Sequence, residues 1–372
     1  MIVPIVLGFY VLVCVSVVLF NCWTALNELL MRRSFTRRKK LYRRWFQSAG
    51  EKYLSLSPEQ HRDMARRMAS ALFSSGRVIA FQAAMEELEA EEPQRFAACA
   101  SLPAEIVREL FPVFSDSSDM KRAYYSYLVA RFRMMRLAPS ERVTEFLLRQ
   151  IREGKSLYNI ENALRAVYSS DRIPLTLEAL GVLDGEGELF LHEKLLVDGL
   201  LTFPHCDALI AALWKQFDAY SSQMQRLLLD FIRFASGAWG EEMLALLERT
   251  EELELKIACL RYFGKYPDER FRAPLYRHTA ESAAAEWELC AACMTVLASY
   301  PGGETVALLK QGLRSRNWHV RYNAAMSLRT LQVDAAQVQD ILTGDDRYAK
   351  EMLQYRLGLT PEAEAEKEAV PV

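Results

Sequence analysis

The chain has 372 residues, 51% hydrophobic and 25% charged, with a formal net charge of −2. A chain of this size can bury a core without disulfides, and its seven scattered cysteines exclude a disulfide scaffold. After Arg44 it holds 38 basic and 47 acidic residues, so its body is acidic and nucleic acid is not expected as a partner.

The N-terminus is an uncharged, apolar run from Ile2 to Trp23, followed by a strongly basic segment. At about 1.5 Å per residue, a helix of this length crosses a hydrocarbon core of roughly 30 Å. Basic residues stay on the cytoplasmic side, so we expect a single-pass protein of the cell membrane, with its N-terminus outside and its C-terminal domain cytoplasmic. The basic block expected at the membrane surface comprises Arg32, Arg33, Arg37, Arg38, Lys39, Lys40, Arg43 and Arg44.

A cleaved secretory signal is the alternative for this start, but no basic region precedes the apolar run and no small-residue cleavage site follows it. We therefore expect a transmembrane anchor over residues 1–30 and a basic juxtamembrane segment over 31–44, with lipid contact through residues 2–44. A helical cap is expected over 45–102, with one helix opening at Ser57-Pro58-Glu59-Gln60.

From Leu102 onward, apolar residues recur at three- and four-residue spacing between Pro, Gly, Asp and Ser punctuation, which predicts an all-α fold. Superposing the second helix of each expected pair gives anchor positions 29 to 40 residues apart, typical of a solenoid. The positions zero, four and eight residues after each anchor share one helix face, which we expect to be buried. The anchors are Met120, Ile160, Leu191, Met224, Leu255, Leu289, Val320 and Ala349.

The segment from Trp318 to Leu331 resembles the second helix of a HEAT repeat, in which Asp or Asn precedes a Val-Arg pair, a small-residue step and a leucine. The matching residues are Asn317, Val320, Arg321, Ala324, Ala325 and Leu328. The resemblance implies a right-handed, armadillo-type α-solenoid of about eight helix pairs over residues 103–359, behind the transmembrane helix. The charged residues 360–372 are expected to be a disordered tail.

The sequence offers no constellation for chemistry. Its five histidines have no metal-ligand spacing, no nucleotide-binding or nucleophile motif occurs, and adjacent carboxylates point to different helix faces. Cys290 and Cys293 form a CxxC, but they lie in an alanine-rich helical run and are expected to be buried. We expect no enzyme, no cofactor and no metal site.

Two sets of residues are candidates for a partner surface. Tyr125 and Tyr127 lie among arginines, a mixture favoured in protein interfaces, whereas Tyr124 falls on the expected core stripe. Core packing of these tyrosines is the competing interpretation. Second helices line the inner curve in HEAT-type solenoids, and positions six and ten after the anchor are the second set. These positions include Asp230, Phe234, Arg261, Lys265, Thr295 and Ser299.

These features together favour a membrane-tethered scaffold that binds a protein partner, itself membrane-associated. The layout resembles single-pass bacterial HEAT-repeat proteins that accompany membrane glycosyltransferases of exopolysaccharide systems, so such an enzyme is the partner that the resemblance implies. The alternatives are a lipid or small-molecule sensor at the membrane surface, using the basic block, and an enzyme resembling HEAT-like chromophore lyases or alkyl-purine DNA glycosylases.

Overall fold

The computed structural model describes residues 2–154, 156–185, 192–282 and 286–357, and within these ranges all regular secondary structure is helical. The chain divides into two compact units, Met1–Leu191 and His192–Val372. The expectation of an all-α protein is therefore confirmed. The tail expected over residues 360–372 and the anchor position Leu191 lie outside the described residues.

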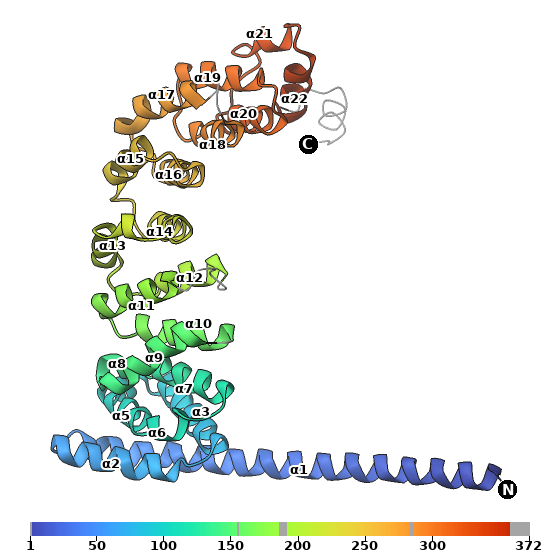
Figure 1. Cartoon of the computed structure of the whole chain (residues 1–372), viewed down its shortest axis with the longest axis vertical. Helices are drawn as coiled ribbons and strands as arrows, with labels where there is room; N and C mark the ends of the chain where they lie inside the picture. The colour runs from blue at the N-terminus through green and yellow to red at the C-terminus, as the bar shows by residue number, and fades with distance from the viewer. Residues whose placement is uncertain (1, 155, 186–191, 283–285, 358–372) are drawn as a thin grey trace, which may run out of the picture. The chain divides into compact units, whose positions relative to one another are not determined.

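The N-terminal unit contains eleven helices among its described residues (Figure 1). They are α1 (Ile2–Tyr53), α2 (Pro58–Ala71), α3 (Ser75–Glu91), α4 (Pro93–Ala98), α5 (Ser101–Glu109), α6 (Phe111–Phe114), α7 (Asp119–Arg131), α8 (Met134–Leu137), α9 (Glu141–Glu153), α10 (Leu157–Tyr168) and α11 (Ile173–Gly185).

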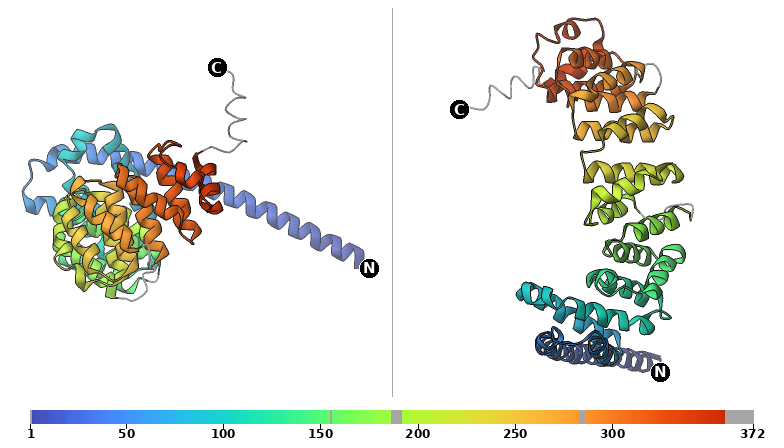
Figure 2. Two further views of the ribbon diagram at one scale, coloured as in Figure 1. Left: turned by 90° about the horizontal axis from the view of Figure 1, so that it is seen from above. Right: turned by 90° about the vertical axis from the view of Figure 1, so that its left-hand side faces the viewer.

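Helix α1 is continuous over 52 residues and projects from the rest of its unit toward the N-terminus (Figures 1 and 2). Between Gly8 and Tyr53 it contains an 18-residue window of mean hydropathy 2.1 that none of the described residues buries. The helix is thus long and apolar enough to cross a membrane. The expected anchor, the basic segment and the start of the cap all belong to this one helix.

The C-terminal part of α1 is built into the cap. Tyr42 and Phe46 are buried, with Tyr42 set edge-on to Phe81 of α3 at 6.0 Å between ring centroids and Phe46 stacked on Phe96 of α4 at 5.5 Å. Helix α2 begins at the expected residue, because Ser57 and Gln60 exchange side-chain and backbone hydrogen bonds in a capping box.

An aromatic cluster forms the middle of the N-terminal unit. Tyr125 of α7 is fully buried and stacks on Phe114 at 5.7 Å, with Phe146 of α9 edge-on to it at 5.7 Å. Helix α7 ends before α8 begins because Arg133, between them, adopts a left-handed conformation with φ of 49°.

The C-terminal unit alternates first and second helices. Each second helix packs on the next, α12 on α14, α14 on α16, α16 on α18, α18 on α20 and α20 on α22, and each also packs on the first helix that precedes it from α13 onward. The helices are α12 (Glu193–Leu200), α13 (Cys206–Trp214), α14 (Ser222–Ala235), α15 (Gly240–Arg249), α16 (Leu253–Lys265), α17 (Arg272–Ser282), α18 (Trp287–Leu297), α19 (Gly303–Leu313), α20 (Trp318–Thr330), α21 (Gln339–Leu342) and α22 (Arg347–Leu357), with 3₁₀ turns at Phe217–Ala219 and Glu269–Phe271.

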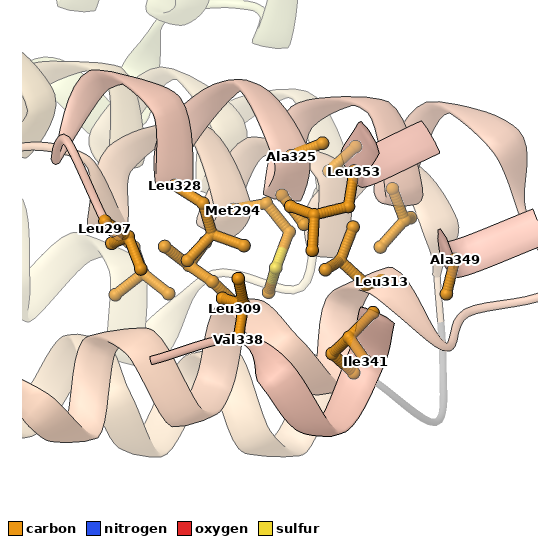
Figure 3. Close-up of a cluster of buried hydrophobic side chains, with 14 of the residues drawn as sticks. Met294, Leu297, Leu309, Leu313, Ala325, Leu328, Val338, Ile341, Ala349 and Leu353 are labelled. Carbon is orange, nitrogen blue, oxygen red and sulfur yellow. The ribbon is translucent and has the colours of Figure 1, made fainter. Parts of the chain in front are cut away.

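The end of this unit shows the packing that the repeat pattern predicts. Leu328 of α20 is fully buried beside Met294 of α18 and Leu309 of α19, and Leu353 of α22 closes the same cluster (Figure 3). The stripe formed by Val320, Ala324 and Leu328 is therefore confirmed as a core stripe. Cys290 and Cys293 are both buried in the same region, as expected.

Candidate docking groove

A groove with a volume of about 720 Å³ runs across α14, α16, α18 and α20 in the C-terminal unit. These are four consecutive second helices, so equivalent positions in successive helices lie next to one another along it. Four of the residues that the sequence proposed for a partner surface line this groove together: Arg261, Lys265, Thr295 and Ser299.

Side chains that donate hydrogen bonds to the preceding second helix fix the floor of the groove. The Ser299 hydroxyl donates to the carbonyl of Gly264 at 2.9 Å, and the Lys265 ammonium donates to the carbonyl of Arg233 at 2.9 Å. Both carbonyls belong to the last turn of their helix, where backbone acceptors lack an intrahelical partner. The Asn323 amide donates to the carbonyl of Ala291, within the preceding second helix α18, at 3.0 Å. Donor and acceptor are 32 to 35 residues apart, close to the repeat spacing of the sequence.

The α14 and α16 side of the groove is rich in cationic side chains. Arg233 pairs with Asp230 at 2.8 Å and lies over the Phe234 ring at 4.4 Å, and the Lys265 ammonium lies 4.9 Å from the centre of the same ring. Arg261 is exposed and forms no ion pair with any described residue. Its guanidinium is therefore free to bind an anionic group, in a groove that Glu254 and Glu288 also line.

Trp287 and His319 line the α18 and α20 side of the groove, and further aromatic rings stand beside them. Trp287 is 44% exposed and stacks on His319 at 5.1 Å, and Trp318, 56% exposed, lies edge-on to the same imidazole at 5.1 Å. Tyr322 stacks on Trp318 at 5.0 Å. Large exposed rings held by their neighbours provide contact area with little loss of side-chain freedom on binding.

Arg233, Trp287 and His319 were not among the residues that the sequence pattern proposed for a partner surface, although all three line the groove. Trp287 and Trp318 each stand two residues before an anchor position and are 31 residues apart, so they are equivalent residues in adjacent repeats. That recurrence was a usable signal. The proposed partner positions all follow the anchor, whereas the two tryptophans precede it.

The other proposed partner residues separate into two outcomes. Asp230 and Phe234 flank the groove on α14 through their contacts with Arg233 and Lys265. Of the two interpretations left open for Tyr125, core packing is the one that holds, because Tyr125 is fully buried in the aromatic cluster and offers no partner surface.

Tyr127 is partly buried and faces α3. Its hydroxyl lies 3.3 Å from Glu86 and 3.2 Å from Gln82, and Glu86 also accepts a hydrogen bond from Arg131 at 3.2 Å. Burial, together with the negative charge of Glu86, raises the pKa of Tyr127. This tyrosine and arginine cluster therefore joins two helices of the chain.

Some residues of the basic block of α1 are paired or partly buried within the chain, and others are exposed. Lys39 pairs with Glu87 of α3 at 3.1 Å, and Arg43 pairs with Glu91 of α3 at 2.5 Å. Arg32 pairs with Glu28 within α1 at 2.5 Å, and Arg38 is partly buried. The remaining four residues of the block are exposed: Arg33, Arg37, Lys40 and Arg44.

Within the described ranges, no three His, Cys, Asp or Glu side chains are placed to hold a metal ion. Neither a scan against models of protein families nor a search of curated proteins gives a match to this sequence. The interpretation of the groove therefore depends on its geometry and charge.

Proposed function

We propose that this protein is a membrane-tethered scaffold whose C-terminal unit docks a protein partner in the groove across α14, α16, α18 and α20. The observation that carries the proposal is the combination, in one groove, of an exposed Arg261 that pairs with no described residue, the cation of Lys265 and the exposed ring of Trp287. Arginine and tryptophan dominate the energy of protein interfaces. The groove suits a partner segment that places an acidic side chain beside an apolar or aromatic one.

In this proposal the two units are parts of an α-solenoid of HEAT type, right-handed and about eight helix pairs long. The alternating packing of first and second helices in the C-terminal unit supports it, as does the recurrence of inter-helix hydrogen bonds at the repeat spacing. The protein acts by binding and not as an enzyme.

Helix α1 serves as the tether in this proposal, crossing the cell membrane once with its N-terminus outside and the two units in the cytoplasm. The apolar start of the helix and the basic residues that follow it support this orientation. Confinement at the bilayer raises the effective concentration of the groove near membrane proteins, so modest contacts suffice. A membrane-associated partner, such as a glycosyltransferase of an exopolysaccharide system, fits this arrangement.

Site-specific photocrosslinking in intact membranes tests the proposal. A photoreactive residue replaces Thr295, which is exposed in the groove, or Ala307, which is exposed on the first helix α19 and serves as the matched control. We expect one protein to be captured reproducibly from position 295, not from 307, and to be lost when Arg261→Glu and Lys265→Glu reverse the local charge. Equal capture at both positions, or capture that survives the charge reversal, would overturn docking in this groove.

A further inference from the structure

The segment of α1 that follows the apolar run has two opposite faces. Tyr42, Phe46, Ala49 and Tyr53 are buried against the cap and follow a four-three-four spacing, which places them on one side of the helix. We call this the cap face.

The four exposed basic residues follow the same four-three-four spacing. We call them the basic stripe: Arg33, Arg37, Lys40 and Arg44. At 3.6 residues per turn, the centre of this stripe lies roughly 180° around the helix from the centre of the cap face. None of the four forms an ion pair with a described residue, whereas Lys39 and Arg43, which lie between the two faces, are paired with α3.

The boundary between apolar and polar side chains crosses α1 obliquely. On the cap-face side polar residues begin early, with Thr24 and then Glu28. On the stripe side the helix stays apolar through the exposed residues Leu26 and Leu30. The first charge on the stripe side, Arg33, therefore comes five residues after Glu28, an axial offset of roughly 7 Å at 1.5 Å per residue.

An oblique boundary is the pattern of a tilted helix. Across a helix about 10 Å wide, an offset of this size corresponds to a tilt of roughly 35°, inside the range of about 0–40° found for transmembrane helices. The direction is also determined: the side that remains apolar longer is the side that leans toward the bilayer. That side is the one on which the basic stripe follows.

We propose that the basic stripe binds anionic phospholipid headgroups and that α1 tilts toward it, so that the cap face is turned away from the bilayer. Lipid is favoured as the occupant because the stripe continues, on the same side of the helix, the apolar surface of Leu26 and Leu30, in the order in which a leaflet passes from chains to headgroups. Anionic headgroups complement its charge. The inference rests on the membrane-spanning placement of α1 proposed above and is independent of the groove.

The test uses the full chain in lipid nanodiscs of phosphatidylcholine alone or with 30% phosphatidylglycerol. Spin labels are attached at Leu41→Cys, near the stripe, or at Ile79→Cys, exposed on α3, after Cys14→Ser and Cys22→Ser remove the two exposed cysteines. A gadolinium-headgroup lipid relaxes labels that lie near the membrane surface. In anionic discs we expect relaxation at position 41 to rise at least twofold and relaxation at position 79 to fall.

The quadruple variant Arg33→Gln, Arg37→Gln, Lys40→Gln, Arg44→Gln should abolish this dependence on lipid charge. Because these side chains are exposed and pair with no described residue, the variant should fold normally. The control Arg142→Gln, Arg149→Gln, Arg152→Gln, Arg329→Gln, which removes four exposed arginines elsewhere, should retain the dependence.

Relaxation that is equal in the two lipids, or unchanged in the quadruple variant, overturns the inference while the tether stands. So does a quadruple variant that keeps the lipid dependence and loses a co-purifying protein, since the stripe would then bind an acidic protein. Failure of the wild-type chain to enter phosphatidylcholine discs overturns the tether itself and the inference with it.

Discussion

Truncating Leu328 to alanine tests the packing between α18, α19, α20 and α22. The side chain is fully buried within a cluster to which all four helices contribute, so the space left by three missing heavy atoms is lined on several sides and cannot collapse easily. Buried leucine-to-alanine changes cost about 2–5 kcal/mol, and we expect about 3 kcal/mol here. At a factor of ten per 1.4 kcal/mol, the open state of these helices becomes roughly 100-fold more populated.

Hydrogen exchange followed by mass spectrometry measures this effect locally, which matters because a chain of stacked helices need not unfold in one step. Amides of α20 and α22 should exchange roughly 100-fold faster in Leu328→Ala. Amides of α9 and α10, in the other unit, should be unaffected. Arg329→Ala is the matched control on the exposed face of the same helix. Equal exchange in the two variants would mean that the register assigned to α20 is wrong.

Three further outcomes are expected. Burial lowers the pKa of His278, so the unfolded chain binds a proton more readily than the folded chain does. The contribution of His278 to stability is therefore full above about pH 6.5 and declines as the pH falls through the lower pKa of the folded state. In urea unfolding between pH 7.5 and 5, the free energy of unfolding should fall with decreasing pH, and His278→Gln should flatten this dependence. Burial raises the pKa of the Cys259 thiol to about 12 and that of Cys293 to about 11, so both should resist a thiol-specific reagent until denaturant is added. A hydrogen bond from Arg321 lowers the pKa of Asp346, which also accepts a hydrogen bond from the Ala349 N–H at 3.0 Å. Arg321→Ala should therefore lower the free energy of unfolding, measured in urea at pH 7, by about 1 kcal/mol. Equal stability of the variant and the wild type would show that the pair contributes nothing.

Hydrophobic spacing located the core face correctly in helices such as α10 and α14. In α10 the anchor stripe Ile160, Leu164 and Tyr168 is buried, and in α14 so is Met224 with its stripe. The same reasoning failed in α7, where the anchor Met120 is 83% exposed. Three tyrosines at positions 124, 125 and 127 fit more than one register there, so spacing alone could not choose between them.

The partners of these tyrosines decide the register of α7. Phe114 and Phe146 provide an aromatic environment for Tyr125, whereas Gln82 of α3 accepts a hydrogen bond from the Tyr124 hydroxyl at 2.7 Å. Both sets of partners come from other helices. A periodicity confined to one helix contains no information about which neighbour meets which side.

Part of the groove could be predicted from the sequence because it follows from the repeat and not from contacts particular to one pair of helices. Arg261, Lys265, Thr295 and Ser299 come together because equivalent positions of stacked helices share a surface, and equivalence is a property of the repeat. The spacing could not show which of their polar groups are already used. The ammonium of Lys265 serves the carbonyl of Arg233, while Arg261 in the same helix has no ion-pair partner among the described residues.

This difference bears on how the proposed scaffold would bind. Lys265, Ser299 and Asn323 hold the floor of the groove through bonds to backbone carbonyls, so the groove exists before a partner arrives and little ordering cost is added on association. In the proposed scaffold, binding would then depend chiefly on Arg261, which has no ion-pair partner among the described residues, and on the exposed ring of Trp287. So few contacts would give modest affinity in solution. Restriction to a membrane surface by α1 would compensate, because a partner in the same bilayer meets the groove at high effective concentration.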